Sequence, residues 1–380
     1  MYPKALLKES FPKSLLTQYY GVNLVFSNGD VSRIYRIANP SFRNLPVHVF
    51  VESATKLLNI VEKIDNEPIE VKNLMHRLTL DVLGKAAFGF DFNNLEDPNN
   101  VYVTAYKEVM EEFRNPFYFV FSFLDNLPRS KATKKIAKLN KLYDEIVESK
   151  RKSMKMDELE KKINNNSADL LERMIYACKD PENPTLTNEE LRHDLAIFML
   201  AGHDTTDAQK KVRDELLRVL GDDLTPSAEQ QKELKYMNMV INENLRLYPP
   251  VAQLPRRFSA QDIKFRNHVI PAKTPIVLSI YGIHHSSRNW KDPEIFIPER
   301  FEDEKHDHYA LLGFGGGNRI CLGINFSLIE QRIMLCALLR KYEISLPEDS
   351  IHKDKLQIGP DFGGTSSPHP LPLIFKRRTE

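Results

Sequence analysis

The sequence predicts a mainly α-helical protein that folds as one domain with a small β region. Apolar residues recur at helical spacing over several long stretches, including 74–88, 234–247 and 324–338. Strand-like alternation is confined to short pieces such as 263–265 and 275–281. The chain has 380 residues, which is enough for one sizeable hydrophobic core.

Composition and charge exclude several classes of function. Apolar residues make up 42% of the chain and charged residues 28%, which is ordinary for a globular protein. The net charge of +1 gives no basis for nucleic acid as the main partner. Three cysteines cannot make a disulfide framework and suit a reducing compartment, so we expect an intracellular protein. Residues 1–4 do not resemble a signal peptide, and no run approaches the ~20 apolar residues of a membrane span.

The first half of the chain contains three segments with simple structural interpretations. Helical spacing over Leu74–Phe88 predicts a core helix that ends at Gly89. The polar stretch Ser149–Asn166 predicts a solvated helix end followed by a loop. An aromatic cluster precedes Pro128, for which packing in the core is the simplest role; its members are Phe113, Phe117, Tyr118, Phe119, Phe121 and Phe123.

A capping box of Thr187 and Glu190 predicts the start of another helix. This helix runs into the sequence Ala-Gly-His-Asp-Thr-Thr at 201–206, where the glycine costs roughly 1 kcal/mol in a helix interior and therefore has a reason to be there. The pattern resumes at once, so residues 188–220 are predicted to form one continuous helix that ends at Gly221.

The next helix, Leu234–Leu247, carries Glu243 and Arg246 three residues apart on one face, where they can pair. Most such pairs are ordinary surface salt bridges. Pro249 and Pro250 end this helix, and short strands are predicted beyond it.

A glycine-rich turn at 314–323 contains Cys321 and leads directly into an apolar helical pattern. The free N–H groups at a helix N-terminus favour a thiolate over a thiol. From residue type alone, the cysteine is open to three interpretations: a nucleophile, a metal ligand, or an inert core residue.

The spacing of residues in this turn favours the metal-ligand interpretation of Cys321. Its residues Phe314, Gly317, Arg319, Cys321 and Gly323 resemble the haem-ligand signature of the cytochromes P450, the haem-thiolate monooxygenases. The resemblance implies the cytochrome P450 fold and haem (iron protoporphyrin IX) as the cofactor, with the Cys321 thiolate as the axial ligand of the haem iron.

The same resemblance assigns roles to other residues. Asp204 and Thr205 match the acid-alcohol pair that guides protons to bound oxygen, and Glu243, Arg246 and Arg300 match a buried structural triad. Arg257 and Arg36 match arginines that hold the haem propionates, although Ser32 stands where the family usually has tryptophan. The aromatic cluster falls where the family has the roof of its substrate channel. The positions that would line the substrate are Ala201, Val251, Leu254 and Thr365.

The resemblance is to eukaryotic microsomal members, and the chain is expected to be a shortened one. Over residues 1–380 we expect a single domain without the family's N-terminal anchor, first helices and first strands, which would leave an unpaired sheet edge. Set against the resembled family, the chain is also expected to lack a block after Asp207. The full-length family member is expected at the surface of the endoplasmic reticulum membrane.

The implied function is insertion of one oxygen atom of O2 into a lipophilic substrate, with electrons from a separate NADPH-dependent haemoprotein reductase. Two alternatives stay open at this point. One is a truncated fragment that holds haem poorly or not at all. The other is a haem-thiolate isomerase or dehydratase, which would have no need of the Asp204–Thr205 pair.

Overall fold

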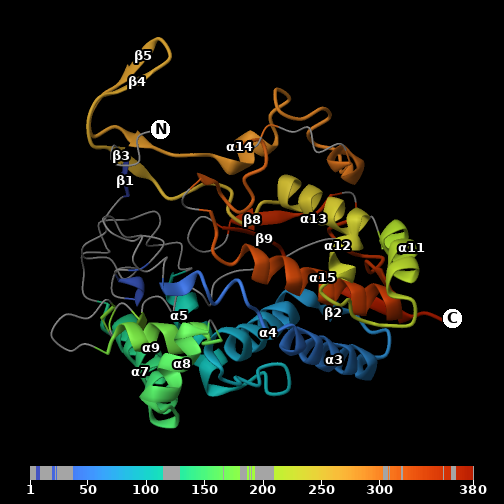
Figure 1. The fold of residues 1–380 in the computed structure, drawn as a ribbon. Helices are drawn as coiled ribbons and strands as arrows, with labels where there is room; N and C mark the ends of the chain where they lie inside the picture. Colours follow the sequence, from blue (N-terminus) through green and yellow to red (C-terminus); the bar gives the residue numbers. More distant parts are fainter. Residues whose placement is uncertain are drawn as a thin grey trace.

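The computed structural model describes residues 6–8, 19–21, 23, 37–113, 129–165, 167–179, 186, 187, 189, 191, 192, 209–302, 307, 309–317, 320–353, 355–360 and 365–379. Over these residues the protein is mainly helical (Figure 1). The helices are α3 (Val47–Ile64), α4 (Val71–Leu83), α5 (Val101–Phe113), α7 (Ser130–Ser153), α8 (Met156–Asn164), α9 (Leu170–Ala177), α11 (Gln209–Leu220), α12 (Gln230–Glu233), α13 (Lys235–Leu247), α14 (Ile280–His284) and α15 (Ile324–Lys341), with the π-helix η1 (Gly84–Phe88) and the 3-10 helix η3 (Pro298–Phe301).

Among the described residues, short antiparallel strands form four small sheets. Their orders are β1-β3-β6, β2-β10-β7, β4-β5 and β8-β9. The strands are β1 (Leu6–Lys8), β2 (Ile69–Glu70), β3 (Arg257–Ser259), β4 (Ile263–Phe265), β5 (His268–Ile270), β6 (Pro275–Ile276), β7 (Tyr342–Ser345), β8 (Ile358–Pro360), β9 (Ser366–Pro368) and β10 (Pro372–Arg377). The β4–β5 hairpin projects from the body of the molecule (Figure 1).

The predicted unpaired edge at the small sheet is wrong for β3. The N-terminal strand β1 pairs antiparallel with β3, with Leu7 opposite Phe258, and β6 pairs along the other side of β3. Only three residues are needed to satisfy the backbone groups of so short a strand, so a brief N-terminal segment suffices.

Two clusters of buried apolar side chains meet at α15. The larger one draws on α3, α4, α5, α7, α9 and one face of α15, and includes Phe50, Leu78 and Ile333. The smaller one joins α11 and α13 to another face of α15, where Cys336 is fully buried. Because α15 contributes to both clusters, the two halves of the chain hold it from opposite sides (Figure 1).

Most predicted helices are present, with two differences. The Leu74–Phe88 helix is confirmed as α4 and η1, and its end at Gly89 is also confirmed. The loop predicted within Ser149–Asn166 is wrong, because Met156–Asn164 forms α8. Acidic residues Asp157 and Glu158 favour the first turn of α8, and its Leu159 is buried, so tertiary packing turns a polar stretch into a helix.

The continuous helix predicted over 188–220 lies largely outside the described residues. Its last part is α11, which ends at Leu220 as predicted, with Gly221 in the left-handed conformation at φ 57°. Glu190 of the predicted capping box is also outside the described residues. A complete capping box does occur at α9, between Asp169 and Glu172.

Candidate functional site

Glu243, Arg246 and Arg300 meet in one buried ion cluster. The Glu243 carboxylate accepts hydrogen bonds from Nε of Arg246 at 2.8 Å, from Nη2 of Arg246 at 2.9 Å and from Nε of Arg300 at 3.1 Å. Glu243 and Arg246 are fully buried, and the side chain of Arg300 is 8% exposed. Both arginines also donate to backbone carbonyls of the segment 291–295, so the cluster joins α13 to the chain before η3.

The helix that carries this cluster, α13, is capped at both ends by residues from other elements. At its N-terminus, the Glu215 carboxylate on α11 accepts the N–H groups of Tyr236 at 2.8 Å and Met237 at 2.9 Å. A carboxylate is favourable at this end of a helix because it complements the unsatisfied N–H groups there. Within the described part of the chain no local side chain caps α13, so the position of this helix depends on α11.

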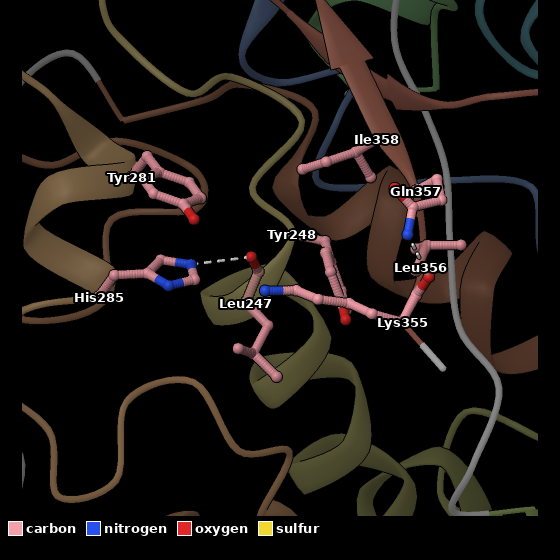
Figure 2. Close-up of a pocket in the computed structure, with 8 residues that line it drawn as sticks. All are labelled: Leu247, Tyr248, Tyr281, His285, Lys355, Leu356, Gln357 and Ile358. Atoms are coloured by element: carbon pink, nitrogen blue, oxygen red, sulfur yellow. Dashed lines mark hydrogen bonds between the residues drawn. The ribbon is translucent and has the colours of Figure 1, made fainter. Parts of the chain in front are cut away.

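Two consecutive histidines reach the carbonyl groups at the C-terminus of α13. Nδ1 of His284 lies 3.1 Å from the Arg246 carbonyl oxygen, and Nε2 of His285 lies 3.0 Å from that of Leu247. Figure 2 shows the second contact, with Tyr281 beside the His285 ring. These are the last carbonyls of the helix, which have no partner within it. Both histidines therefore bond to the backbone at the C-terminal end of α13.

A cavity of about 260 Å³ adjoins this end of α13. Its walls come from the end of α13, from α14 and from the segment that leads into β8 (Figure 2). The Lys355 ammonium lies at its edge and pairs with Glu294 at 3.4 Å, and Glu294 also accepts from Nδ1 of His285 at 2.7 Å. The cavity therefore lies at the C-terminal end of the helix that carries the ion cluster.

The cysteine loop is held by hydrogen bonds within its own backbone. The N–H of Cys321 donates to the Phe314 carbonyl at 2.8 Å, and the N–H of Gly315 donates to the Leu312 carbonyl at 2.8 Å. Gly317 has φ 64°, a left-handed conformation that costs little only for glycine. The ring of Phe314 is half-buried against the smaller core cluster, so it anchors the loop beside α13.

Cys321 is the exposed cysteine, whereas Cys336 is buried and Cys178 is intermediate. The loop places it three residues before α15, whose N-cap is Gly323. Desolvation by the surrounding protein raises the pKa of the Cys321 thiol, and a hydrogen bond from the Gly323 backbone opposes this shift. The net direction is opposite to the lowered pKa that a helix N-terminus predicts. A bound metal cation would still deprotonate the thiol, because a coordinated thiol loses its proton outright.

The remaining predicted site residues fall into two groups. Val251 and Thr365, both predicted to line substrate, form an isolated antiparallel bridge, and the N–H of Leu254 donates to the Leu278 carbonyl at 2.9 Å. Arg257 is half-buried in β3. The others lie outside the described residues: Ser32, Arg36, Ala201, Asp204, Thr205 and Arg319, together with the predicted aromatic cluster beyond Phe113.

Comparisons with known proteins agree with this geometry. Residues 2–371 match the family described as Cytochrome P450. The chain is 31% identical over 377 residues to the bifunctional cytochrome P450/NADPH–P450 reductase 2 of Bacillus subtilis. The aligned region covers 92% of this chain and 35% of that protein. It is 28% identical over 382 residues to the chloroplastic protein LUTEIN DEFICIENT 5 of Arabidopsis thaliana, covering 91% and 62%, and 29% identical over 385 residues to cytochrome P450 4A7 of Oryctolagus cuniculus, covering 91% and 75%.

The chain therefore belongs to the cytochrome P450 family, whose members are haem monooxygenases. It spans about a third of the length of the bifunctional relative and less than two thirds of the chloroplastic one. None of the helices in the described part of the chain is long and apolar enough to cross a membrane.

The described residues fit the family's haem cofactor at the proximal side. The sulfur belongs to an exposed residue on a loop whose backbone is fixed by hydrogen bonds, and Ile320 beside it presents an apolar side chain that is 38% exposed. Among the described residues, no heavy atom would lie within 4 Å of a Cβ atom placed at Gly317. An exposed thiol with an apolar neighbour and a side-chain-free backbone suits a flat, mainly apolar macrocycle.

Proposed function

We propose that this chain is a haem-thiolate monooxygenase that inserts one oxygen atom of O2 into a small lipophilic molecule. The observation that carries the proposal is the exposed Cys321 on a fixed loop beside the buried Glu243–Arg246–Arg300 cluster. Family membership supports the reaction class, and this arrangement supports the assignment of the ligand.

Cys321 would hold the haem iron through its sulfur, and Arg319, Arg257 and Arg36 would hold the propionates by paired hydrogen bonds. The bound haem supplies oxygen activation, which the electron donation of a thiolate ligand favours. The Gly323 N–H lies where it can donate to the sulfur and moderate its charge. Phe314, Gly317 and Gly323 would shape the loop around the ligand, and the buried ion cluster would keep the loop in register with α13.

Asp204 and Thr205 would hold and pass the protons that oxygen activation consumes. Ala201, Val251, Leu254 and Thr365 would line the substrate. The bridge between Val251 and Thr365 supports this assignment, because it brings two of these positions together from segments more than a hundred residues apart. The apolar side chains among them suit a lipophilic molecule.

We further propose that a separate NADPH-dependent haemoprotein reductase supplies the electrons. The bifunctional relative is named as both a cytochrome P450 and an NADPH–P450 reductase, which supports a donor of this kind. By resemblance to microsomal members of the family, we place the protein inside the cell at the endoplasmic reticulum membrane.

The direct test is to express the chain with haem, reduce it and add carbon monoxide. We expect the red-shifted Soret band of a thiolate-ligated haem, with loss of that band in Cys321→Ala and no loss in Cys336→Ala, whose thiol is buried in the core. A folded, soluble chain that takes up no haem would overturn the proposal and favour the fragment alternative. A thiolate band that survives in Cys321→Ala would overturn the ligand assignment.

The proton relay has its own test. In Thr205→Ala, oxygen and NADPH consumption should continue while product formation falls, because the hydroxyl that would pass the proton is gone. Unchanged coupling between NADPH use and product would remove the relay from the mechanism, and a reaction that needs no oxygen would favour the isomerase alternative.

A further inference from the structure

We propose that His284 is a positioning residue that ties the buried ion cluster to the cysteine loop. It lies at the end of α14, is fully buried, and makes hydrogen bonds to both structures at once. No local pattern in the sequence indicates this role, because the two partners of His284, Arg246 and Leu312, lie 38 and 28 residues away in the chain.

The bond to the loop determines which nitrogen of the ring carries the proton. The backbone N–H of Leu312 points at Nε2 of His284 at 2.7 Å, so Nε2 must be an acceptor without a proton. The neutral ring then carries its proton on Nδ1, which donates to the Arg246 carbonyl at 3.1 Å. Nη1 of Arg246 donates back to the His284 carbonyl at 2.9 Å. The residue is therefore bonded twice to the ion cluster and once to the loop.

The electrostatic surroundings keep this ring neutral. The charged or titratable groups that act on it are the Arg246 guanidinium on α13 and the neighbouring His285, and both oppose a further positive charge. Burial has the same effect and is the largest cause of a pKa lowered to about 4. A neutral ring is the form that can accept from Leu312, so the tether is intact at neutral pH.

The tether reaches the cysteine through a short series of backbone contacts. Leu312 holds the N–H of Gly315 through its carbonyl, and Phe314 holds the N–H of Cys321 in the same way, each at 2.8 Å. Fixing Leu312 therefore fixes the start of the loop that ends at Cys321. The effect on haem binding rests on the proposed role of Cys321, whereas the tether itself does not.

The test separates the two bonds of His284 by substitution in the apoprotein. His284→Gln places an amide oxygen near the position of Nε2 and keeps an acceptor for Leu312, whereas His284→Asn reaches only the position of Nδ1. His285→Asn is the matched control, because His285 caps the adjacent Leu247 carbonyl and is bonded to Glu294 rather than to the loop.

We expect amide hydrogen exchange at Leu312 to rise about ten- to a hundredfold in His284→Asn, the range for losing a buried hydrogen bond, and much less in His284→Gln or His285→Asn. Equal exchange at Leu312 in His284→Asn and in the unmodified chain would overturn the tether. If His284→Asn does not fold, nitrogen-15 NMR of the unmodified chain decides: a protonated Nδ1 and bare Nε2 at His284 are expected, and the opposite tautomer would overturn the proposal.

Haem-loaded protein gives the remaining readout. In His284→Asn the thiolate Soret band should convert to that of a non-thiolate form at a lower denaturant concentration than in His285→Asn, because the loop is less restrained. Unchanged conversion would remove the positioning role. Failure of the proposed function is distinguishable, since the unmodified chain would then take up no haem and show no thiolate band while Leu312 stays protected from exchange.

Discussion

The ion cluster on α13 and the cysteine loop differ in how they are stabilised, although they lie close together. The cluster is buried, and its Glu243 carboxylate accepts four hydrogen bonds, including one from the Ile297 N–H at 2.8 Å. The loop is held mainly by hydrogen bonds within its own backbone, and its cysteine is exposed. The difference indicates that the fold keeps stability and chemistry in separate residues. Substitutions in the cluster should then lower the free energy of unfolding, whereas substitution of Cys321 should weaken haem binding alone.

Arg246→Met should show the largest effect, about 3–5 kcal/mol of lost stability, because it leaves the Glu243 carboxylate buried without its main partner. Guanidinium unfolding of the apoprotein measures it. Arg377→Met is the control, since Arg377 pairs with Glu62 at 2.7 Å with its side chain 66% exposed, and a loss below about 1 kcal/mol is expected there. Similar small losses in the two variants would show that the cluster does not stabilise the fold.

Acid should weaken the link between the two regions through His284. Its pKa in the folded protein is about 4, below the value of 6.5 for a free histidine. The folded state therefore resists protonation, so the stability is complete above pH 6.5 and is lost as the pH falls toward 4, by up to about 3 kcal/mol. Unfolding midpoints between pH 7.5 and 4.5 should fall less steeply in His284→Asn than in His285→Asn. Parallel profiles in the two variants would contradict this.

A rise in pH should destabilise the protein through Glu330 on α15. Desolvation raises the pKa of its carboxyl to about 7 against a hydrogen bond from Thr79, and Oε1 has no partner among the described residues. Stability should fall as the pH rises from 4.5 to 7, by roughly 1–3 kcal/mol. Glu330→Gln should recover it at pH 8 and change little at pH 4.5, whereas the exposed Glu348→Gln should do neither. A pH-independent effect in Glu330→Gln would argue against a protonated carboxyl.

Cys321→Ala should have the smallest effect on stability, within about 0.5 kcal/mol, because the side chain it removes is exposed. Urea unfolding of the apoprotein measures it. A loss above about 2 kcal/mol would show that the loop also carries stability and would break the division between the two regions.

Local sequence patterns predicted the elements that depend on near neighbours. The helices α4, α13 and α15, the β4 strand and the end of α11 at Gly221 follow from apolar spacing and turn chemistry. The resemblance to the cytochromes P450 also predicted which three side chains form the cluster on α13. The resemblance could not indicate that the pKa of the Cys321 thiol is raised, because desolvation of the sulfur depends on how the folded chain surrounds it.

Several contacts that position the site had no signal in the sequence. The carboxylate that caps α13 comes from α11, the histidines at its other end come from α14, and β1 pairs with a strand about 250 residues away. The residues that make these contacts do not stand out in their local sequence. Their partners are backbone groups, which every residue carries. Only the path of the folded chain brings such a donor and acceptor together.

The sequence alone determined the family and the helical architecture, and it predicts Cys321 as the haem ligand, because these depend on residue types at fixed local spacing. The tertiary structure decided how that cysteine is presented. It buried the ion cluster, capped α13 from two other helices, and joined the cluster to the cysteine loop through His284. These contacts connect segments far apart in the chain, and their strength comes from burial, which no local pattern of residues contains.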